Sequence, residues 1–309
     1  MSGAVITGWG SAQPREVVTN ADLEARLDTN DAWILERTGI RERRVGGTTT
    51  GLAVEAGRQA LALAGVDPSD VQLLMVSTNT PDQPVPSTSA LVQDALGAGG
   101  GVFDLNSGCS GFVYGLVAAN GIIATGLERV LLVASDTVSR IVDPADRGTA
   151  ILFGDGAGAV MLQAAPDDGM LLGWDLGADG SAAPLLYRMD GGYVVMDGKE
   201  VFRKAVRVTV ASAEAALENA KVDEQEIALF IPHQANLRII EAVNKRLGIP
   251  VDKTAINVDT AGNTSSASIP LALAEAANQG RLQEGDLVLM AGFGAGMTWA
   301  SAVVRWGRS

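Results

Sequence analysis

The chain has 309 residues, and 47% of them are hydrophobic, which suffices for a large buried core in one or two domains. The formal net charge of −13 disfavours a bulk attraction to nucleic acid or to an anionic membrane, so an acidic partner would need a local basic patch. A single cysteine excludes an intrachain disulfide, the apolar runs are too short to span a bilayer, and the start of the chain lacks the pattern of a signal peptide; we therefore expect a soluble cytoplasmic protein.

The predicted elements occur in the same order in two halves of the chain. Hydrophobic periodicity predicts, for the first half, a helix ending near residue 64, a strand at 71–77, a helix at 89–97, a buried strand at 102–105, a helix at 112–125 and a strand at 130–135. The second half repeats this order with a helix ending near 220, a strand at 227–231, a helix at 238–248, a strand running into the turn at 262–263, a helix, and a strand at 287–292.

This repeated order indicates an internal duplication. The offset between the halves is nearly constant, and it pairs Cys109 with Asn263, 154 residues later (263 − 109). The alternative is that any α/β protein alternates strands and helices. The duplication predicts two similar α/β halves with buried strands, an N-terminal half over 1–165 and a C-terminal half over 166–309.

Cys109 is a candidate nucleophile. It lies between Gly108 and Ser110, at a turn from a predicted strand to a predicted apolar helix. The positive end of a helix dipole is expected to lower the pKa of the thiol, and the neighbouring glycines let a substrate approach the backbone. A small buried core cysteine is the alternative that the local sequence leaves open.

His233 and Asn263 are candidate partners of this thiol. His233, the only histidine, follows an apolar strand, and strand ends are where α/β sheets place ligands, although a structural histidine is the alternative. Asn263 lies at the turn that matches Cys109 under the duplication. A thiolate attacks a carbonyl carbon, and histidine and asparagine can donate hydrogen bonds to an oxygen that develops negative charge.

Other kinds of site find little support. One cysteine and one histidine do not supply a zinc site of the usual kind, so we expect no metal. The glycine-rich segments 154–158 and 292–297 match neither a dinucleotide-binding fingerprint nor a P-loop, and we expect segment 292–297 to line the active site.

These residues resemble β-ketoacyl-acyl-carrier-protein synthase III, a condensing enzyme of the thiolase superfamily. The resemblance covers essentially the whole chain, and its specific segments are 31–44, the cysteine turn, 143–158, 231–240, 261–270 and 292–299. It implies a thiolase-like five-layer α/β/α/β/α fold of two pseudo-symmetric repeats, and a homodimer.

The resemblance also implies a reaction. Cys109 would take an acyl group from acyl-CoA, and malonyl-acyl-carrier protein would then lose carbon dioxide and attack the acyl-cysteine. His233 and Asn263 would stabilise the enolate, and backbone N–H groups of Cys109 and of the loop Gly294, Ala295 and Gly296 would hold the oxyanion. Phe293 matches a family position beside His233 and Asn263. Acyl-CoA is a substrate here, and no cofactor is implied.

Further family positions concern the two substrates. The residues that match the CoA site are Trp33, Arg37, Thr38, Arg147 and Asn236, with Trp33 and Arg147 on either side of the adenine. The residues that match the carrier-protein docking site are Arg203, Arg238 and Lys245, with Arg246 beside them; Arg203 replaces a usual lysine. Without the resemblance, these basic helix faces are equally well read as ordinary solvated surfaces.

Two departures bear on the acyl group. Val85 occupies a position where some members carry a bulky aromatic that closes the acyl pocket across the dimer, so a longer or branched chain could enter. The segment 179–195 looks shorter than the usual loop near that pocket.

Residue counts separate the competing readings. Thiolases need a second catalytic cysteine and elongating ketoacyl synthases a second histidine, and this chain has neither; segments 37–43 and 233–239 fit chalcone synthases poorly. The main alternative is a related enzyme of secondary metabolism with another acceptor. A Cys-His-Asn hydrolase would need a tight cysteine–histidine ion pair, and a non-catalytic binding subunit would not need all three side chains.

Overall fold

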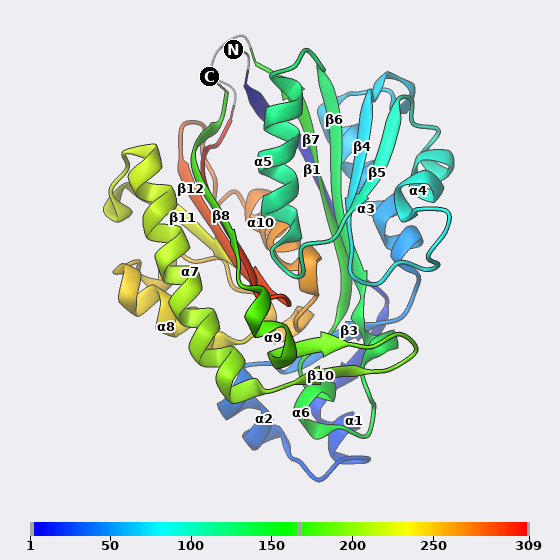
Figure 1. Cartoon of the computed structure of the whole chain (residues 1–309), viewed down its shortest axis with the longest axis vertical. Helices are drawn as coiled ribbons and strands as arrows, with labels where there is room; N and C mark the ends of the chain where they lie inside the picture. The colour runs from blue at the N-terminus through cyan, green and yellow to red at the C-terminus, as the bar shows by residue number, and fades with distance from the viewer. Residues whose placement is uncertain (1–2, 166–168, 308–309) are drawn as a thin grey trace.

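The computed structural model describes residues 3–165 and 169–307 and contains two main β-sheets separated by helices (Figure 1). The first sheet has the strand order β1 (Ala4–Ala12), β7 (Asp155–Ala164), β6 (Arg129–Thr137), β4 (Leu73–Ser77) and β5 (Gly101–Leu105). The second has the order β8 (Leu171–Ala178), β13 (Thr298–Arg305), β12 (Leu287–Gly294) and β11 (Ile227–Pro232).

The two sheets repeat one topology. β4 runs parallel to β6 as β11 runs parallel to β12. β7 lies antiparallel between β6 and β1, and β13 lies antiparallel between β12 and β8. The predicted fold of two pseudo-symmetric repeats is therefore confirmed. The division into halves at residues 165 and 166 stays a prediction, and residues 166–168 lie outside the described part.

Three helical layers complete the five-layer arrangement (Figure 1). The outer helices on the first sheet are α3 (Thr49–Ala64) and α4 (Thr88–Leu96), and those on the second are α7 (Gly198–Ala220) and α8 (Leu237–Leu247). The central layer holds α5 (Gly111–Ile123) and α10 (Ser268–Asn278). The largest apolar core surrounds this central pair, because both sheets bury a face against it.

The helix ends follow the sequence signals. α4 begins after Ser87, whose side chain caps the Ala90 N–H, and ends at Gly97 in the left-handed conformation. α8 begins after Asn236 and ends at Gly248, also left-handed. A glycine adopts this conformation without strain from a Cβ atom, which explains why both predicted stops are correct.

Two predicted strands differ from the structure. β5 is the outer strand of its sheet and is partly exposed, whereas a buried strand was expected at 102–105. The strand expected before the turn at 262–263 is absent; short helix α9 (Val258–Ala261) stands there. The Gln234 side chain explains this difference. Its amide accepts from the Asn257 N–H at 3.0 Å and donates to the Ala255 carbonyl at 3.0 Å, so these backbone groups bond to a side chain and not to a neighbouring strand.

Smaller elements cover one end of the two sheets, at the bottom of Figure 1. They are β2 (Glu16–Thr19), β3 (Glu42–Val45), α1 (Asn20–Glu24), α2 (Asp31–Thr38), α6 (Arg147–Ala150), β9 (Leu186–Arg188) and β10 (Val194–Met196). Within residues 3–165 and 169–307, no helix has the length and apolar character needed to cross a membrane.

Candidate active site

Cys109, His233 and Asn263 line one cavity of about 610 Å³, together with Phe293 and Gly294. Cys109 lies just before α5, His233 just after β11, and Asn263 just after α9. The structure thus brings Cys109 together with two side chains that lie more than a hundred residues further along the sequence.

Glycines allow this convergence. A Cβ atom at Gly292 would lie 3.6 Å from both the His233 Cβ and the Ser110 Cα, and one at Gly294 would lie 2.2 Å from the Cys109 backbone nitrogen. Contacts below 3 Å are not tolerated, so Gly294 must lack a side chain. Of the predicted oxyanion loop, Gly294 lines the cavity, whereas Ala295 and Gly296 do not.

The pKa of the Cys109 thiol differs from the prediction. Burial raises its pKa to about 12, a hydrogen bond with Ser265 opposes this rise, and the negative charge of Asp136 adds to it. The lowered pKa expected from the helix dipole is therefore wrong. The cause is position: α5 starts at Gly111 with Ser110 as its N-cap, so Cys109 lies outside the first turn, where the dipole acts.

His233 is neutral and held in one orientation. Burial lowers its pKa to about 3. Its Nδ1 lies 2.6 Å from the Ser268 Oγ, and the Gln234 N–H donates to that same oxygen at 3.3 Å. The serine oxygen accepts from Gln234, and the serine hydrogen can be donated to Nδ1. This pattern favours the tautomer that carries its hydrogen on Nε2.

Asn263 is fixed by its neighbours. Its backbone bonds to Leu152 and Gly154, through an N–H that donates at 2.8 Å and a carbonyl that accepts at 3.0 Å. The Ser265 N–H donates to the Asn263 Oδ1 at 3.0 Å. The side-chain oxygen is thereby engaged, and the Nδ2 hydrogens remain as donors toward a ligand in the cavity.

The mouth of the cavity is aromatic and basic. Trp33, Arg37, Thr38 and Asn236 line it, whereas Arg147 does not. The guanidinium carbons of Arg37 and Arg147 each lie 4.7 Å from the Trp33 ring centroid, so a purine can enter between Trp33 and Arg147 only if Arg147 swings outward.

Two of the predicted CoA-site side chains already have partners within the protein. The Thr38 hydroxyl donates to the Ile34 carbonyl at 2.7 Å, and it accepts from the Ile40 N–H at 3.0 Å. The Asn236 amide caps α8 and donates to the Arg37 carbonyl at 3.0 Å. Both residues therefore shape the mouth of the cavity through these bonds.

A basic rim continues from this mouth. Arg203 on α7 and Arg238 on α8 both line the cavity, together with Lys199. Lys245 and Arg246 are exposed on α8 but do not line the cavity. The protein as a whole is strongly acidic, so these cations form the local patch that an acidic partner would need.

Comparison with known proteins gives a consistent result. Residues 103–180 match the family described as 3-oxoacyl-[acyl-carrier-protein] synthase III, and residues 217–306 match its C-terminal region. A relative from Roseiflexus castenholzii, named beta-ketoacyl-[acyl-carrier-protein] synthase III, is 48% identical over 98% of each chain. The chain belongs to the synthase III family.

Solved structures agree with this assignment. The 3-oxoacyl-[acyl-carrier-protein] synthase III of Aquifex aeolicus is 43% identical, with a TM-score of 0.96, over 98% of this chain and all of the other. The priming β-ketosynthase of the R1128 polyketide pathway is 37% identical, with a TM-score of 0.93, over 99% of this chain and 97% of the other.

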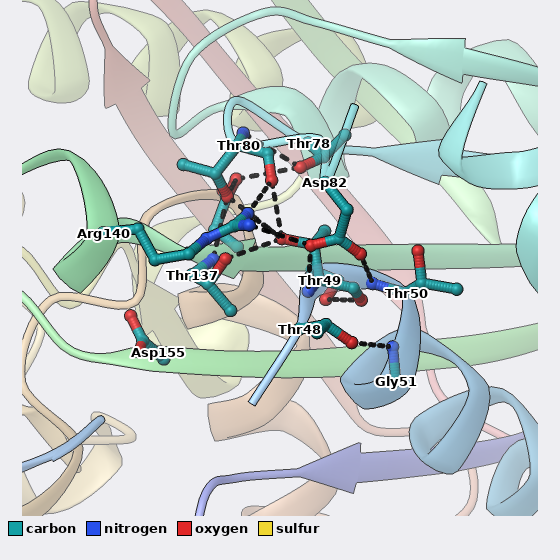
Figure 2. Close-up of polar contacts among 12 residues, drawn as sticks. Thr48, Thr49, Thr50, Gly51, Thr78, Thr80, Asp82, Thr137, Arg140 and Asp155 are labelled. Atoms are coloured by element: carbon teal, nitrogen blue, oxygen red, sulfur yellow. Dashed lines mark hydrogen bonds and ion pairs between the residues drawn. The ribbon is translucent and has the colours of Figure 1, made fainter. Parts of the chain in front are cut away.

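In this synthase III, Val85 does not line the cavity and is 83% exposed on the loop that follows β4. Figure 2 shows how this loop is anchored. Asp82 accepts from the Thr49 and Thr50 N–H groups at 3.0 and 2.8 Å, and Arg140 reaches Asp82 at 3.0 Å and the Thr80 carbonyl at 2.7 Å. The loop is therefore fixed to the body of the protein while Val85 projects outward.

The segment 179–195 also contributes to the site of the synthase. It forms a 3-10 helix (Gly180–Leu185) followed by the β9–β10 hairpin, which ends one residue beyond the segment at Met196. Leu186 and Met196 of this hairpin line the cavity.

Sequence reasoning missed several polar residues beside the three central ones. Ser265 contacts Cys109, Ser268 contacts His233, and Asp136 on β6 binds Asn79 and Ser266. The run of serines after Asn263 and the Ser-Asp pair at the end of an apolar strand were the available signals, because hydroxyl and carboxyl groups in apolar surroundings need partners.

Proposed function

We propose that this synthase III condenses an acyl-CoA with malonyl-acyl-carrier protein to give a β-ketoacyl-acyl-carrier protein, the initiating step of fatty acid synthesis. The observation that carries the proposal is a single cavity with a thiol, a neutral histidine and an asparagine inside it, and an aromatic, basic mouth. This arrangement suits two thioesters that arrive in turn through one entrance.

In the first step, the Cys109 thiolate attacks the thioester carbonyl of acyl-CoA. The bond between carbon and the CoA sulfur breaks, and CoA leaves as its thiolate. The backbone N–H groups of Cys109 and of the Gly294–Gly296 loop stabilise the oxyanion, and the tight packing of Gly294 on Cys109 supports this role.

In the second step, malonyl-carrier protein loses carbon dioxide, and the bonding electrons pass to the adjacent carbon. The enolate oxygen accepts hydrogen bonds from His233 Nε2 and Asn263 Nδ2, the donors left free by Ser268 and Ser265. The carbanion then attacks the acyl-cysteine carbonyl, and the Cys109 thiolate leaves. Phe293, whose ring meets His233 edge-on at 5.2 Å between centroids, excludes water from these donors.

The cavity mouth suits the carriers of both acyl groups. Trp33 and Arg37 offer stacking and positive charge to the CoA adenine and phosphates, with Arg147, Thr38 and Asn236 around them. Arg203, Arg238, Lys245 and Arg246 offer a positive surface to an acidic carrier protein. The reaction as written uses only these residues and the two thioesters, and we propose no metal and no other cofactor.

We also propose a homodimer in the cytoplasm. The outer side of β5 is unpaired within the described chain, Phe103 on it is exposed, and Val85 projects from the adjoining loop. A second copy would cover this edge and receive Val85 in its acyl pocket. Light scattering after size exclusion tests the dimer: a monomer at micromolar concentration would contradict it.

Intact-mass spectrometry tests the central proposal. We expect the protein to gain the mass of one acyl group from at least one acyl-CoA in a panel of different chain lengths, and the Cys109→Ser variant to gain none. Adding malonyl-carrier protein should then release a β-ketoacyl product. An unchanged mass with every acyl-CoA would rule out the acyl-enzyme, and turnover only with another acceptor would favour secondary metabolism.

A further inference from the structure

The thiol of Cys109 lies in surroundings that oppose its ionisation. It is desolvated, and the carboxylate of Asp136 adds repulsion, yet nucleophilic attack needs the thiolate. His233 lines the same cavity but burial keeps it neutral, so it supplies no positive charge. Among the described residues, a side-chain hydrogen bond to the Cys109 Sγ comes from Ser265, whose Oγ lies 3.4 Å away.

The direction of this hydrogen bond is set by a chain of side chains. The Asn79 Nδ2 donates to the Ser265 Oγ at 3.0 Å and to the Asp136 Oδ2 at 3.2 Å. A side-chain nitrogen of this kind only donates, so the Ser265 oxygen accepts and its own hydrogen is left for the sulfur.

Asp136 fixes the other end of the chain. Its carboxylate is fully buried and accepts backbone N–H groups of Asn79 at 2.7 Å and Ser266 at 3.0 Å, as well as the Ser266 hydroxyl at 2.7 Å. Backbone N–H groups cannot accept, so Asp136 acts as the acceptor throughout. The amide of Asn79 therefore keeps its nitrogen toward both Asp136 and Ser265.

The backbone of Ser265 is held in an unusual conformation at the same point. Its φ is +54°, a left-handed value that a serine adopts only when its surroundings impose it. The conformation lets one residue serve two partners, because its N–H reaches the Asn263 Oδ1 while its hydroxyl reaches the Cys109 Sγ.

We propose that the Ser265 hydroxyl donates a hydrogen bond to the Cys109 thiolate, and that Asn79 and Asp136 are positioning residues that point this hydroxyl at the sulfur. The inference rests on the proposed nucleophilic role of Cys109. It assigns a distinct task to each side of the Ser265 residue: the side chain stabilises the nucleophile, and the backbone orients an enolate donor.

The single cysteine makes a direct test possible, because alkylation by iodoacetamide then reports Cys109 alone. The rate of mass gain, measured against pH on the full-length protein without acyl-CoA, gives the apparent pKa of the thiol. Ser265→Gly removes the hydroxyl, and glycine accepts the left-handed backbone. We expect the midpoint to rise by about one pH unit in this variant, since a hydrogen bond to a charged group is lost.

Asn79→Ala is the second variant of this experiment. It keeps the Ser265 hydroxyl but removes the amide that donates to this hydroxyl and orients it. We expect a smaller upward shift of the midpoint in this variant. Ser301→Ala is the matched control: Ser301 is fully buried on β13 and does not line the cavity, so its loss should leave the midpoint unchanged. Thermal unfolding of each variant reports general damage to the fold, which would expose the thiol and lower the midpoint, the opposite of the expected shift.

A midpoint that stays at the native value in folded Ser265→Gly overturns the proposal. Should that variant not fold, an unchanged midpoint in Asn79→Ala overturns it instead. The proposed function fails in a different measurement, namely absent self-acylation of the native protein, so the two failures are distinguishable.

Discussion

Asp179 and Met297 bind each other through both backbone groups: the Met297 N–H donates to Asp179 at 2.9 Å, and the Asp179 N–H donates to Met297 at 2.7 Å. The Asp179 carboxylate also meets the Lys204 ammonium of α7 at 2.6 Å. The segment that follows Gly294–Gly296 is therefore tied to the helix that carries Arg203. These contacts connect the proposed docking surface on α7 to the proposed oxyanion loop.

Lys204→Met should loosen this connection. We expect kcat of the condensation to fall about tenfold, because the Gly294–Gly296 loop is held less firmly. KM for acyl-CoA should stay constant, because the mouth of the cavity is unchanged. Lys204 holds the pKa of Asp179 at about 2, so the pair is formed above pH 4, and it is lost only as pH falls toward 2. Steady-state kinetics at pH 7 provide the check, with Lys221→Met at the far end of α7 as control; an unchanged kcat would contradict the connection.

Ser268→Ala should affect decarboxylation more than self-acylation. The variant removes the hydroxyl that holds the His233 tautomer, so the Nε2 donor is lost for part of the molecules. We expect carbon dioxide release from malonyl-carrier protein to slow about tenfold, the rate equivalent of one hydrogen bond. Acyl-enzyme formation, followed by intact mass, should change less than twofold. Equal losses in both steps would argue against the tautomer role.

The low pKa of His233 predicts a flat pH response. An ordinary histidine gains a proton near pH 6.5, whereas His233 stays neutral until about pH 3. We expect carbon dioxide release by the Cys109→Ser variant, which lacks the titrating thiol, to show no inflection between pH 8 and 5.5. An inflection near 6.5 that disappears in a further His233→Gln exchange would refute this.

The same shift has a consequence for folding. Below about pH 6.5, His233 binds a proton in the unfolded chain but stays neutral in the folded protein. The contribution of His233 to the free energy of unfolding therefore decreases as the pH falls. Denaturant unfolding of the native protein and His233→Gln at pH 7 and 5 should show a steeper loss for the native protein.

Arg238→Glu should impair the reaction with malonyl-carrier protein but not self-acylation by acyl-CoA. Arg238 is exposed and its guanidinium packs over the Phe202 ring at 5.7 Å, whereas the Cys109 thiol is removed from solvent. We expect kcat/KM for malonyl-carrier protein to fall at least tenfold at low salt, and self-acylation to stay within about twofold. Arg58→Glu, an exposed arginine on α3, is the control. Parallel losses in both half-reactions would contradict docking at Arg238.

Val85→Phe should narrow the range of accepted acyl chains. The loop is anchored by Asp82 and Arg140, so in the proposed dimer a larger side chain at position 85 would enter the acyl pocket of the partner subunit. We expect a drop of more than tenfold in kcat/KM for branched or long acyl-CoAs and little change for acetyl-CoA. A uniform change across the panel would show that residue 85 does not select the chain.

The sequence predicted what depends on local signals and failed where distant packing decides. Apolar runs and glycine stops located β4, β6, α4 and α8, because periodicity and caps are local. The edge position of β5 follows from sheet order, which no segment encodes by itself. The raised pKa of Cys109 follows from burial by distant segments, and Ser265, its hydrogen-bond partner, lies 156 residues away.

The division of the site between the two repeats also has a consequence for synthesis of the protein. A ribosome completes Cys109 well before it reaches His233, Asn263 and Ser265, and the Gly294 that packs on the cysteine comes last. A nascent chain therefore carries the thiol without the Ser265 hydroxyl, the proposed enolate donors or the proposed oxyanion loop. With the roles proposed above, acyl transfer begins only when the final strands have been made, and we expect an incomplete chain to consume no CoA thioester.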